Sequence, residues 1–174
     1  AVTGFEEHVR EVVTEILDRA LAAGTVDAVG DMAAPLPASM IGELIGFPDD
    51  MVGKLQEWSE RTISLGGGPR YFEDAGIIAT FEFAQACADL YEEKKGCPAD
   101  DVMSLWVDHE KAGLKDSKAF GIDQITSDCL LLLDGGAETT RTVIARTMLN
   151  LINRPDQWEM MRNGADLTLA VEEF

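Results

Sequence analysis

The sequence predicts a mainly α-helical protein, because apolar residues recur at helical spacing along most of its length. The clearest case is residues 122–153, which contain no proline and are apolar on both flanks, so we expect one long central helix of roughly 45–50 Å. No segment alternates apolar and polar residues over the length that a strand would require. The 174 residues can bury one core, and nothing in the composition requires a second domain.

Two helices are expected in the first part of the chain. Residues 5–23 carry valine, isoleucine and leucine at helical spacing, with glutamates in the first turns, where the helix dipole favours anions. Residues 27–46 contain Pro35 and Pro37, and a proline inside a helix removes a backbone hydrogen bond. We therefore expect this segment to begin as a turn or broken helix and to wind regularly over residues 38–45.

The middle of the chain predicts three further helices and two connections. Helical patterns cover residues 49–64, 71–95 and 98–110. The three glycines and the proline at 66–69 form the clearest loop, because consecutive glycines leave the backbone many accessible conformations. Residues 113–120 form a polar connection into the long helix. The aromatic side chains within 71–95 are expected mainly in the core, since aromatic residues mostly serve packing.

The composition excludes several classes of partner and site. With 32 acidic and 14 basic residues the net charge is -18, which opposes binding to nucleic acids and to anionic membranes. The longest apolar run, at 129–133, is too short to span a membrane, so a soluble, cytoplasmic protein is expected. The three cysteines have no paired spacing, which suits a reducing cytosol. His8 and His109 have no second ligand one turn away, so no metal site is expected at either histidine.

The middle of the long helix is unusual for a core helix. Gly135 and Gly136 are adjacent, and each costs about 1 kcal/mol relative to alanine in a helix interior. Adjacent glycines remove side chains where another surface comes close. An acid and two alcohols follow directly, Glu138, Thr139 and Thr140. Small residues beside a carboxyl and hydroxyls predict a functional site.

These residues resemble a known motif. Residues 135–140, Gly-Gly-Ala-Glu-Thr-Thr, resemble the (Ala/Gly)-Gly-x-(Asp/Glu)-Thr motif in the distal helix of haem-thiolate monooxygenases, the cytochrome P450 family, particularly its soluble bacterial members. The stretches 35–48, 58–60, 154–158 and 170–174 resemble other helices and turns of that family in the same order. The resemblance implies the helical portion of the P450 fold, as a single partial domain over residues 1–174. The N-terminal part and the C-terminal haem-ligand part are expected to lie outside it.

The resemblance also implies roles for individual residues. Thr139 would donate a hydrogen bond to dioxygen or its water, and Glu138 would link that network to solvent, so both are expected to be catalytic. Gly135 and Gly136 would let the helix approach the haem, as cofactor-binding positions. Glu173 would be structural, as half of the family's Glu-x-x-Arg pair. The alternative for Thr139 is that its hydroxyl only bonds back to the carbonyl one turn earlier, as threonines within helices often do.

Leu131 and Asp134 are expected at the substrate pocket. Asp134 departs from the family's pattern, in which the residue before the two small positions is usually apolar. An ionised carboxylate there is costly unless it is paired. At helical spacing Asp134, Glu138 and Arg141 share one side of the helix, so Arg141 is expected to neutralise both acids. In the alternative, Asp134 reaches the pocket and binds a hydroxyl or amine of the substrate.

The cofactor and partners follow from the same resemblance. It implies haem b (iron protoporphyrin IX), dioxygen, a small apolar organic substrate, and electrons from NAD(P)H delivered by a ferredoxin reductase and a ferredoxin. The iron ligand of the family is a cysteine in a later loop, and none of Cys87, Cys97 and Cys129 has that context, so no metal ligand is expected here. The expected function is hydroxylation or epoxidation of the substrate. The alternative is a noncatalytic helical ligand-binding module in which the glycine pair only allows close helix packing.

Overall fold

The computed structural model describes residues 5–68, 70, 73–111 and 121–173. Every regular element among these residues is helical, as expected from the sequence. The elements with α-helical geometry are α1 (Phe5–Ala23), α2 (Pro35–Ile45), α3 (Val52–Thr62), α4 (Asp74–Gly96), α5 (Val102–Lys111), α6 (Ile122–Leu133), α7 (Thr139–Ile152), α8 (Pro155–Arg162) and α9 (Leu167–Glu173). The shorter turns are η2 (Ala28–Ala33), η3 (Asp49–Met51), η4 (Ile63–Gly67) and η7 (Asp134–Glu138). The connection expected over 113–120 lies outside the described residues.

The second segment begins as a broken helix, as its prolines predicted. Asp27 caps a π-helical turn, η2, by accepting hydrogen bonds from the backbone N–H groups of Val29 and Gly30 at 2.8 and 3.1 Å. The regular helix then starts at Pro35 instead of residue 38. Both prolines fall in its first turn, where backbone N–H groups have no intrahelical acceptor, so proline's lack of an N–H costs no helical hydrogen bond. Gly46 ends the helix with φ of +111°, a conformation that favours glycine.

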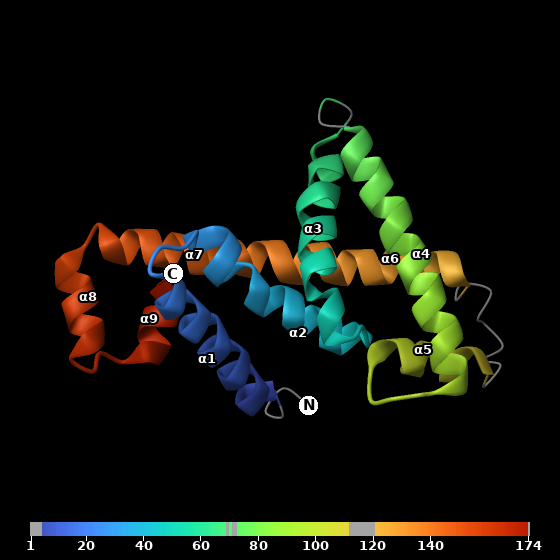
Figure 1. Ribbon diagram of the computed structural model, residues 1–174, viewed down its shortest axis with the longest axis horizontal. Helices are drawn as coiled ribbons and strands as arrows, with labels where there is room; N and C mark the ends of the chain where they lie inside the picture. Colours follow the sequence, from blue (N-terminus) through green and yellow to red (C-terminus); the bar gives the residue numbers. More distant parts are fainter. Residues whose placement is uncertain (1–4, 69, 71–72, 112–120, 174) are drawn as a thin grey trace.

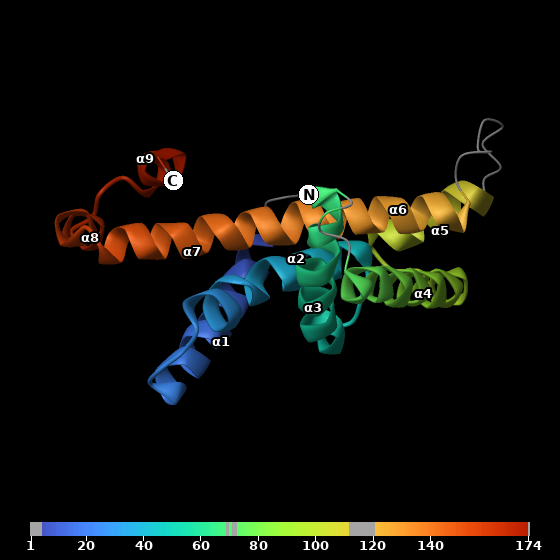
Figure 2. The same cartoon turned by 90° about the horizontal axis from the view of Figure 1, so that it is seen from above.

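The long central helix is present as a straight rod of three consecutive segments, α6, η7 and α7 (Figure 1). Helix α3 crosses it at η7 and α4 crosses it at α6, whereas α8 and α9 turn back from the end of α7 (Figure 1). Viewed from above, α2, α3 and α4 all lie on the same side of the rod (Figure 2). The helices that the structure describes therefore cover one side of the rod around η7.

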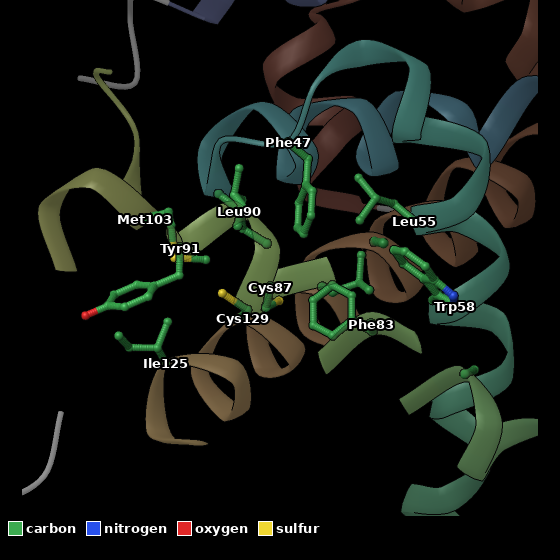
Figure 3. Close-up of a cluster of buried hydrophobic side chains, with 14 of the residues drawn as sticks. Phe47, Leu55, Trp58, Phe83, Cys87, Leu90, Tyr91, Met103, Ile125 and Cys129 are labelled. Atoms are coloured by element: carbon green, nitrogen blue, oxygen red, sulfur yellow. The ribbon is translucent and has the colours of Figure 1, made fainter. Parts of the chain in front are cut away.

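The core lies where α3, α4, α5 and α6 meet (Figure 3). Phe83 is fully buried and meets the ring of Trp58 edge to face, with ring centroids 5.7 Å apart. Trp58 Nε1 donates a hydrogen bond to Glu82 at 2.9 Å, so its polar edge is satisfied. Tyr91 is also buried, whereas Phe81 is 73% exposed. The expectation of core aromatics in this helix is thus correct for Phe83 and Tyr91 and wrong for Phe81, which faces outward.

A buried ion pair fastens the end of α4 to the start of α5. Lys94 Nζ lies 2.7 Å from Asp101 Oδ2, and the two side chains are only 10% and 5% exposed. The other oxygen of Asp101 accepts a hydrogen bond from the Ser104 backbone N–H at 2.7 Å. A Cβ added at Gly46 would lie 2.6 Å from the Asp101 carboxyl carbon. The carboxylate is therefore enclosed on several sides, and its charge is balanced by one lysine.

Candidate functional site

The glycine pair lies in a π-helical turn, η7, which spans Asp134–Glu138 and interrupts the α-helical hydrogen-bonding pattern of the rod without ending it. The sequence predicted an uninterrupted α-helix here. Glycines lower the stability of an α-helix, so a change of helical geometry is least costly where two of them are adjacent. Single π turns inside α-helices are frequent at functional sites. The expected site and the irregular turn therefore coincide.

The two glycines face different surroundings. A Cβ added at Gly136 would lie 2.4 Å from Cδ1 and 2.7 Å from Cγ1 of Ile41 in α2, so Gly136 is required for close packing of α2 on the rod. At Gly135 no heavy atom of the described residues lies within 4 Å of an added Cβ. Helix α2 therefore occupies the side of the rod at Gly136, whereas the described residues leave the side at Gly135 open.

Gly135 belongs to an open strip on the rod that we call the open face, formed by Leu131, Gly135 and Thr139. These residues are four apart and therefore share one side of a helix. Leu131 is 72% exposed, and Gly135 and Thr139 are also exposed. Thr139 Oγ1 donates a hydrogen bond to the Gly135 carbonyl at 2.6 Å, which is the local bond weighed as the alternative for this threonine. A hydroxyl that donates in this way still has lone pairs with which to accept.

Glu138 is held beside the open face by a polar cluster that joins the rod to α3. Arg141 Nη2 donates to Glu138 Oε2 at 2.5 Å, and Nη1 of the same arginine donates to Glu60 Oε1 at 2.6 Å. Ser59 Oγ donates to the other oxygen of Glu138 at 3.4 Å. The side chains of Glu138 and Arg141 are 13% and 19% exposed, so this pair is largely shielded from solvent. Both oxygens of Glu138 are therefore engaged, and its orientation depends on α3.

Asp134 is bound to α3 through a different residue. Thr62 Oγ1 lies 2.8 Å from Asp134 Oδ1, and the Asp134 side chain is half-buried. Burial raises the pKa of Asp134 above its ordinary value, and the negative charge of Glu138 adds to the rise. A hydrogen bond donated by the Thr62 hydroxyl to the ionised carboxylate would oppose that rise. Arg141 pairs with Glu138 as expected, but its second ion pair is with Glu60 and not with Asp134. The expected network on this side of the rod exists, with Thr62 in the place that Arg141 was expected to take.

Sequence reasoning missed the contribution of α3. Ser59 and Thr62 are hydroxyl residues three apart in α3, 1% and 3% exposed, and both contact the acids of the rod. Their spacing places them on one side of that helix, and a pair of small polar residues on an apolar side is the signal that could have found them. Which helix they face depends on tertiary packing, and the sequence of α3 alone does not specify it.

Glu173 lies apart from this cluster, exposed at the end of α9. It borders a groove of about 580 Å³ between α7, α8 and α9, together with Leu151 and Met161.

The open face fits one side of a flat apolar group such as haem. Gly135 leaves space above the backbone, Leu131 offers an apolar contact and Thr139 a polar one. The thiols do not complete such a site: Cys87 and Cys129 are buried in the core, and Cys97 is exposed just after α4. Hydrogen bonding with Cys129 and burial raise the pKa of the Cys87 thiol, which disfavours the thiolate that binds iron (Figure 3). The described residues would therefore contact such a group without ligating its metal.

No described helix combines the length and apolarity needed to cross a membrane. Within the described residues, His, Cys, Asp and Glu side chains form no group of three that could hold a metal ion.

Comparisons with known proteins agree with the resemblance seen in the sequence, although no family model matches the chain. A steroid C26-monooxygenase of Mycolicibacterium smegmatis is 29% identical over 172 residues, which are 99% of this chain and 39% of that protein. Cytochrome P450 CYP107DY1 of Priestia megaterium is 28% identical over 175 residues, 99% of this chain and 41% of that protein. The solved structure of ligand-free cytochrome P450 TbtJ1 matches with a TM-score of 0.76 and 26% identity, over 94% of this chain and 42% of that structure.

The chain thus spans 39% and 41% of the length of the two curated relatives. Its matches agree in family and in fold, and its glycine pair, acid and threonine lie in a π turn of the long helix. The chain belongs to the cytochrome P450 family.

Proposed function

We propose that the full-length protein is a haem-dependent monooxygenase that activates dioxygen and hydroxylates or epoxidises a small apolar organic substrate. The observation that carries the proposal is the open face, where Thr139 lies exposed beside Gly135, at which no described residue would meet an added Cβ, with the shielded Glu138 next to Thr139 in the chain. Similarity to a steroid monooxygenase supports an apolar substrate. We further propose haem b as the cofactor and NAD(P)H as the electron source, through a ferredoxin reductase and a ferredoxin.

Haem, when bound, supplies the activation of dioxygen and the insertion of one oxygen atom. The residues of this chain would supply protons to that reaction and would limit the access of water. Thr139 holds its proton toward the Gly135 carbonyl at 2.6 Å and can accept a further hydrogen bond on its oxygen. Glu138 is a shielded carboxylate next to Thr139 in the chain, and its pairing with Arg141 fixes its orientation. These two residues are the proposed relay.

Leu131 and Asp134 are the proposed substrate contacts on the rod. Leu131 presents an exposed apolar side chain on the open face, one turn before Gly135. Asp134 is half-buried and held by Thr62, so only part of its carboxyl group remains accessible to a ligand. A substrate would therefore make mainly apolar contacts here, with Asp134 as the polar group at the margin.

Replacement of Thr139 tests the relay. In the full-length protein loaded with haem, Thr139→Ala should lower the product formed per NAD(P)H by roughly tenfold or more and raise peroxide release, because a positioned proton donor contributes roughly 100-fold or more. Thr139→Ser keeps the hydroxyl and should retain most of the coupling. Thr140→Ala is the matched control, since Thr140 is exposed and adjacent. Unchanged coupling in Thr139→Ala would remove Thr139 from the relay.

The alternative function, a noncatalytic helical ligand-binding module, predicts a different spectrum. A haem-thiolate enzyme that is reduced and exposed to carbon monoxide gives the Soret band of that class, whereas a noncatalytic module binds no haem. The open face favours the enzyme, because packing of α2 accounts for Gly136 but leaves Gly135 unexplained.

A further inference from the structure

The Thr62 hydroxyl faces more acceptors than it has protons. Its oxygen lies 2.8 Å from the Trp58 carbonyl oxygen, 2.8 Å from Asp134 Oδ1 and 3.4 Å from the Ser59 carbonyl oxygen. A hydroxyl donates one hydrogen bond and accepts others with its lone pairs. It can therefore donate to the carbonyl of its own helix or to Asp134, but not to both. The oxygen that receives no proton would then face another oxygen at hydrogen-bond distance.

A proton on Asp134 resolves this conflict. A protonated carboxyl group has its own O–H, which can donate to Thr62 Oγ1 at the observed 2.8 Å. Thr62 then donates to the Trp58 carbonyl, also at 2.8 Å, as threonines within helices commonly do. Each short contact then contains one proton. The result is a directional chain from the π turn of the rod, through Thr62, to the backbone of α3.

The surroundings of Asp134 also favour its neutral form. Thr62 is 3% exposed, so the contact lies away from water. Arg141 is already engaged by two carboxylates, at 2.5 and 2.6 Å. The charged groups on α3 and α2, the helices packed against the π turn, are paired elsewhere. On α3, Lys54 and Arg61 both pair with Glu57 and Glu60 pairs with Arg141; on α2, Glu43 pairs with His8 of α1. A second ionised carboxylate beside Glu138 would repel it without gaining a cation of its own.

We propose that Asp134 is a positioning residue that acts as a neutral carboxylic acid, donating through Thr62 to the Trp58 carbonyl, clamping the π turn to α3 and leaving Glu138 as the single carboxylate of the relay. The proposal rests on the function proposed above. Loss of the proton removes the donor and places two negative charges on one turn of helix. The Glu138 side chain is then held less firmly in one orientation, and less product is formed per NAD(P)H because proton delivery beside Thr139 is less efficient.

The direction of the pH effect follows from linkage. The folded pKa of Asp134 is raised above its ordinary value of 3.8, mainly by burial. The protonated group therefore contributes stability that is complete below pH 3.8 and is lost as the pH rises through the folded pKa. Asp134→Asn keeps the shape and a donor but cannot ionise. Relative to this variant, the wild type should lose stability as the pH rises through that interval.

Difference infrared spectroscopy of the full-length holoprotein reads the protonation directly. The wild type minus Asp134→Asn should show the carbonyl stretch of a protonated carboxylic acid, disappearing at a midpoint above 3.8. Thr62→Val removes the acceptor and should lower that midpoint, while Thr62→Ser should leave it unchanged. If Thr62 instead donates to an ionised Asp134, Thr62→Val raises the midpoint. That result, or a midpoint at or below 3.8, would overturn the proposal.

The pH profile of coupling tests the positioning role. Product formed per NAD(P)H in the wild type should fall severalfold as the pH rises through the infrared midpoint, and Asp134→Asn should show no such step. A wild-type profile that is flat across the midpoint would remove the positioning role. The proposed function fails separately, through absence of the thiolate-type Soret band under carbon monoxide, and in that case the infrared result for Asp134 still holds.

Discussion

Replacing Gly136 by alanine tests whether this glycine is required for helix packing. The new Cβ would lie 2.4 Å from Ile41 Cδ1 and 2.7 Å from Cγ1, and Ile41 is itself packed against the core. Overpacking of this kind costs about 1–3 kcal/mol. Alanine recovers about 1 kcal/mol of helix propensity relative to glycine. The net effect of Gly136→Ala should therefore be a loss of up to about 2 kcal/mol.

Gly135→Ala is the matched control, because the same substitution one residue earlier meets no heavy atom of the described residues within 4 Å. It should be neutral or stabilising by up to about 1 kcal/mol. Urea unfolding of both variants should give free energies of unfolding that differ by about 1–3 kcal/mol at a constant slope. Equal stability of the two variants would refute the packing argument. In the haem-loaded protein the order should reverse, with Gly135→Ala changing the visible spectrum and Gly136→Ala leaving it unchanged.

Two further comparisons use neighbours on the rod and the buried ion pair. Leu133→Ala should lower the free energy of unfolding by about 2–5 kcal/mol because Leu133 is fully buried. Leu131→Ala should change the free energy of unfolding by no more than about 0.5 kcal/mol, because Leu131 is exposed, and should instead alter substrate affinity, measured by spectral titration. Equal losses from the two substitutions would contradict the assignment of the open face. Asp101→Ala should lower the free energy of unfolding by about 3–5 kcal/mol, since it leaves Lys94 buried without its partner. Thermal unfolding that is unchanged by Asp101→Ala would show that water replaces the carboxylate.

The helices were predictable where the signal is local. Helix α1 spans Phe5–Ala23 as the spacing of its apolar residues predicted, because no proline or glycine interrupts the pattern. The rod was predicted with nearly the same limits because no proline interrupts residues 122–153. The start of α2 was placed three residues too late, because a proline inside a helix and a proline in its first turn look alike until the helix start is known.

The site was predictable in composition and only partly in geometry. The residues from Asp134 to Thr139 were singled out because glycines, acids and hydroxyls are unusual together in a core helix. The different surroundings of Gly135 and Gly136 depend on the position of Ile41, which is distant in the sequence. The contact between Thr62 and Asp134 joins residues 72 apart, so no local pattern contains it.

The π turn also limits how the rod can change in length. An α-helix advances about 100° per residue, so the residue that a π turn adds shifts the phase of everything beyond it by about that angle. The side of α6 that meets α4 and the side of α7 that meets η2 are therefore in register only while residues 134–138 keep their extra residue. A one-residue deletion there would leave a continuous helix, but the side of α7 that now packs against η2 would be rotated away from it by about 100°. A chimera that joins α6 of this chain to the second half of a purely α-helical rod would be misphased in the same way, unless the crossover keeps the whole turn.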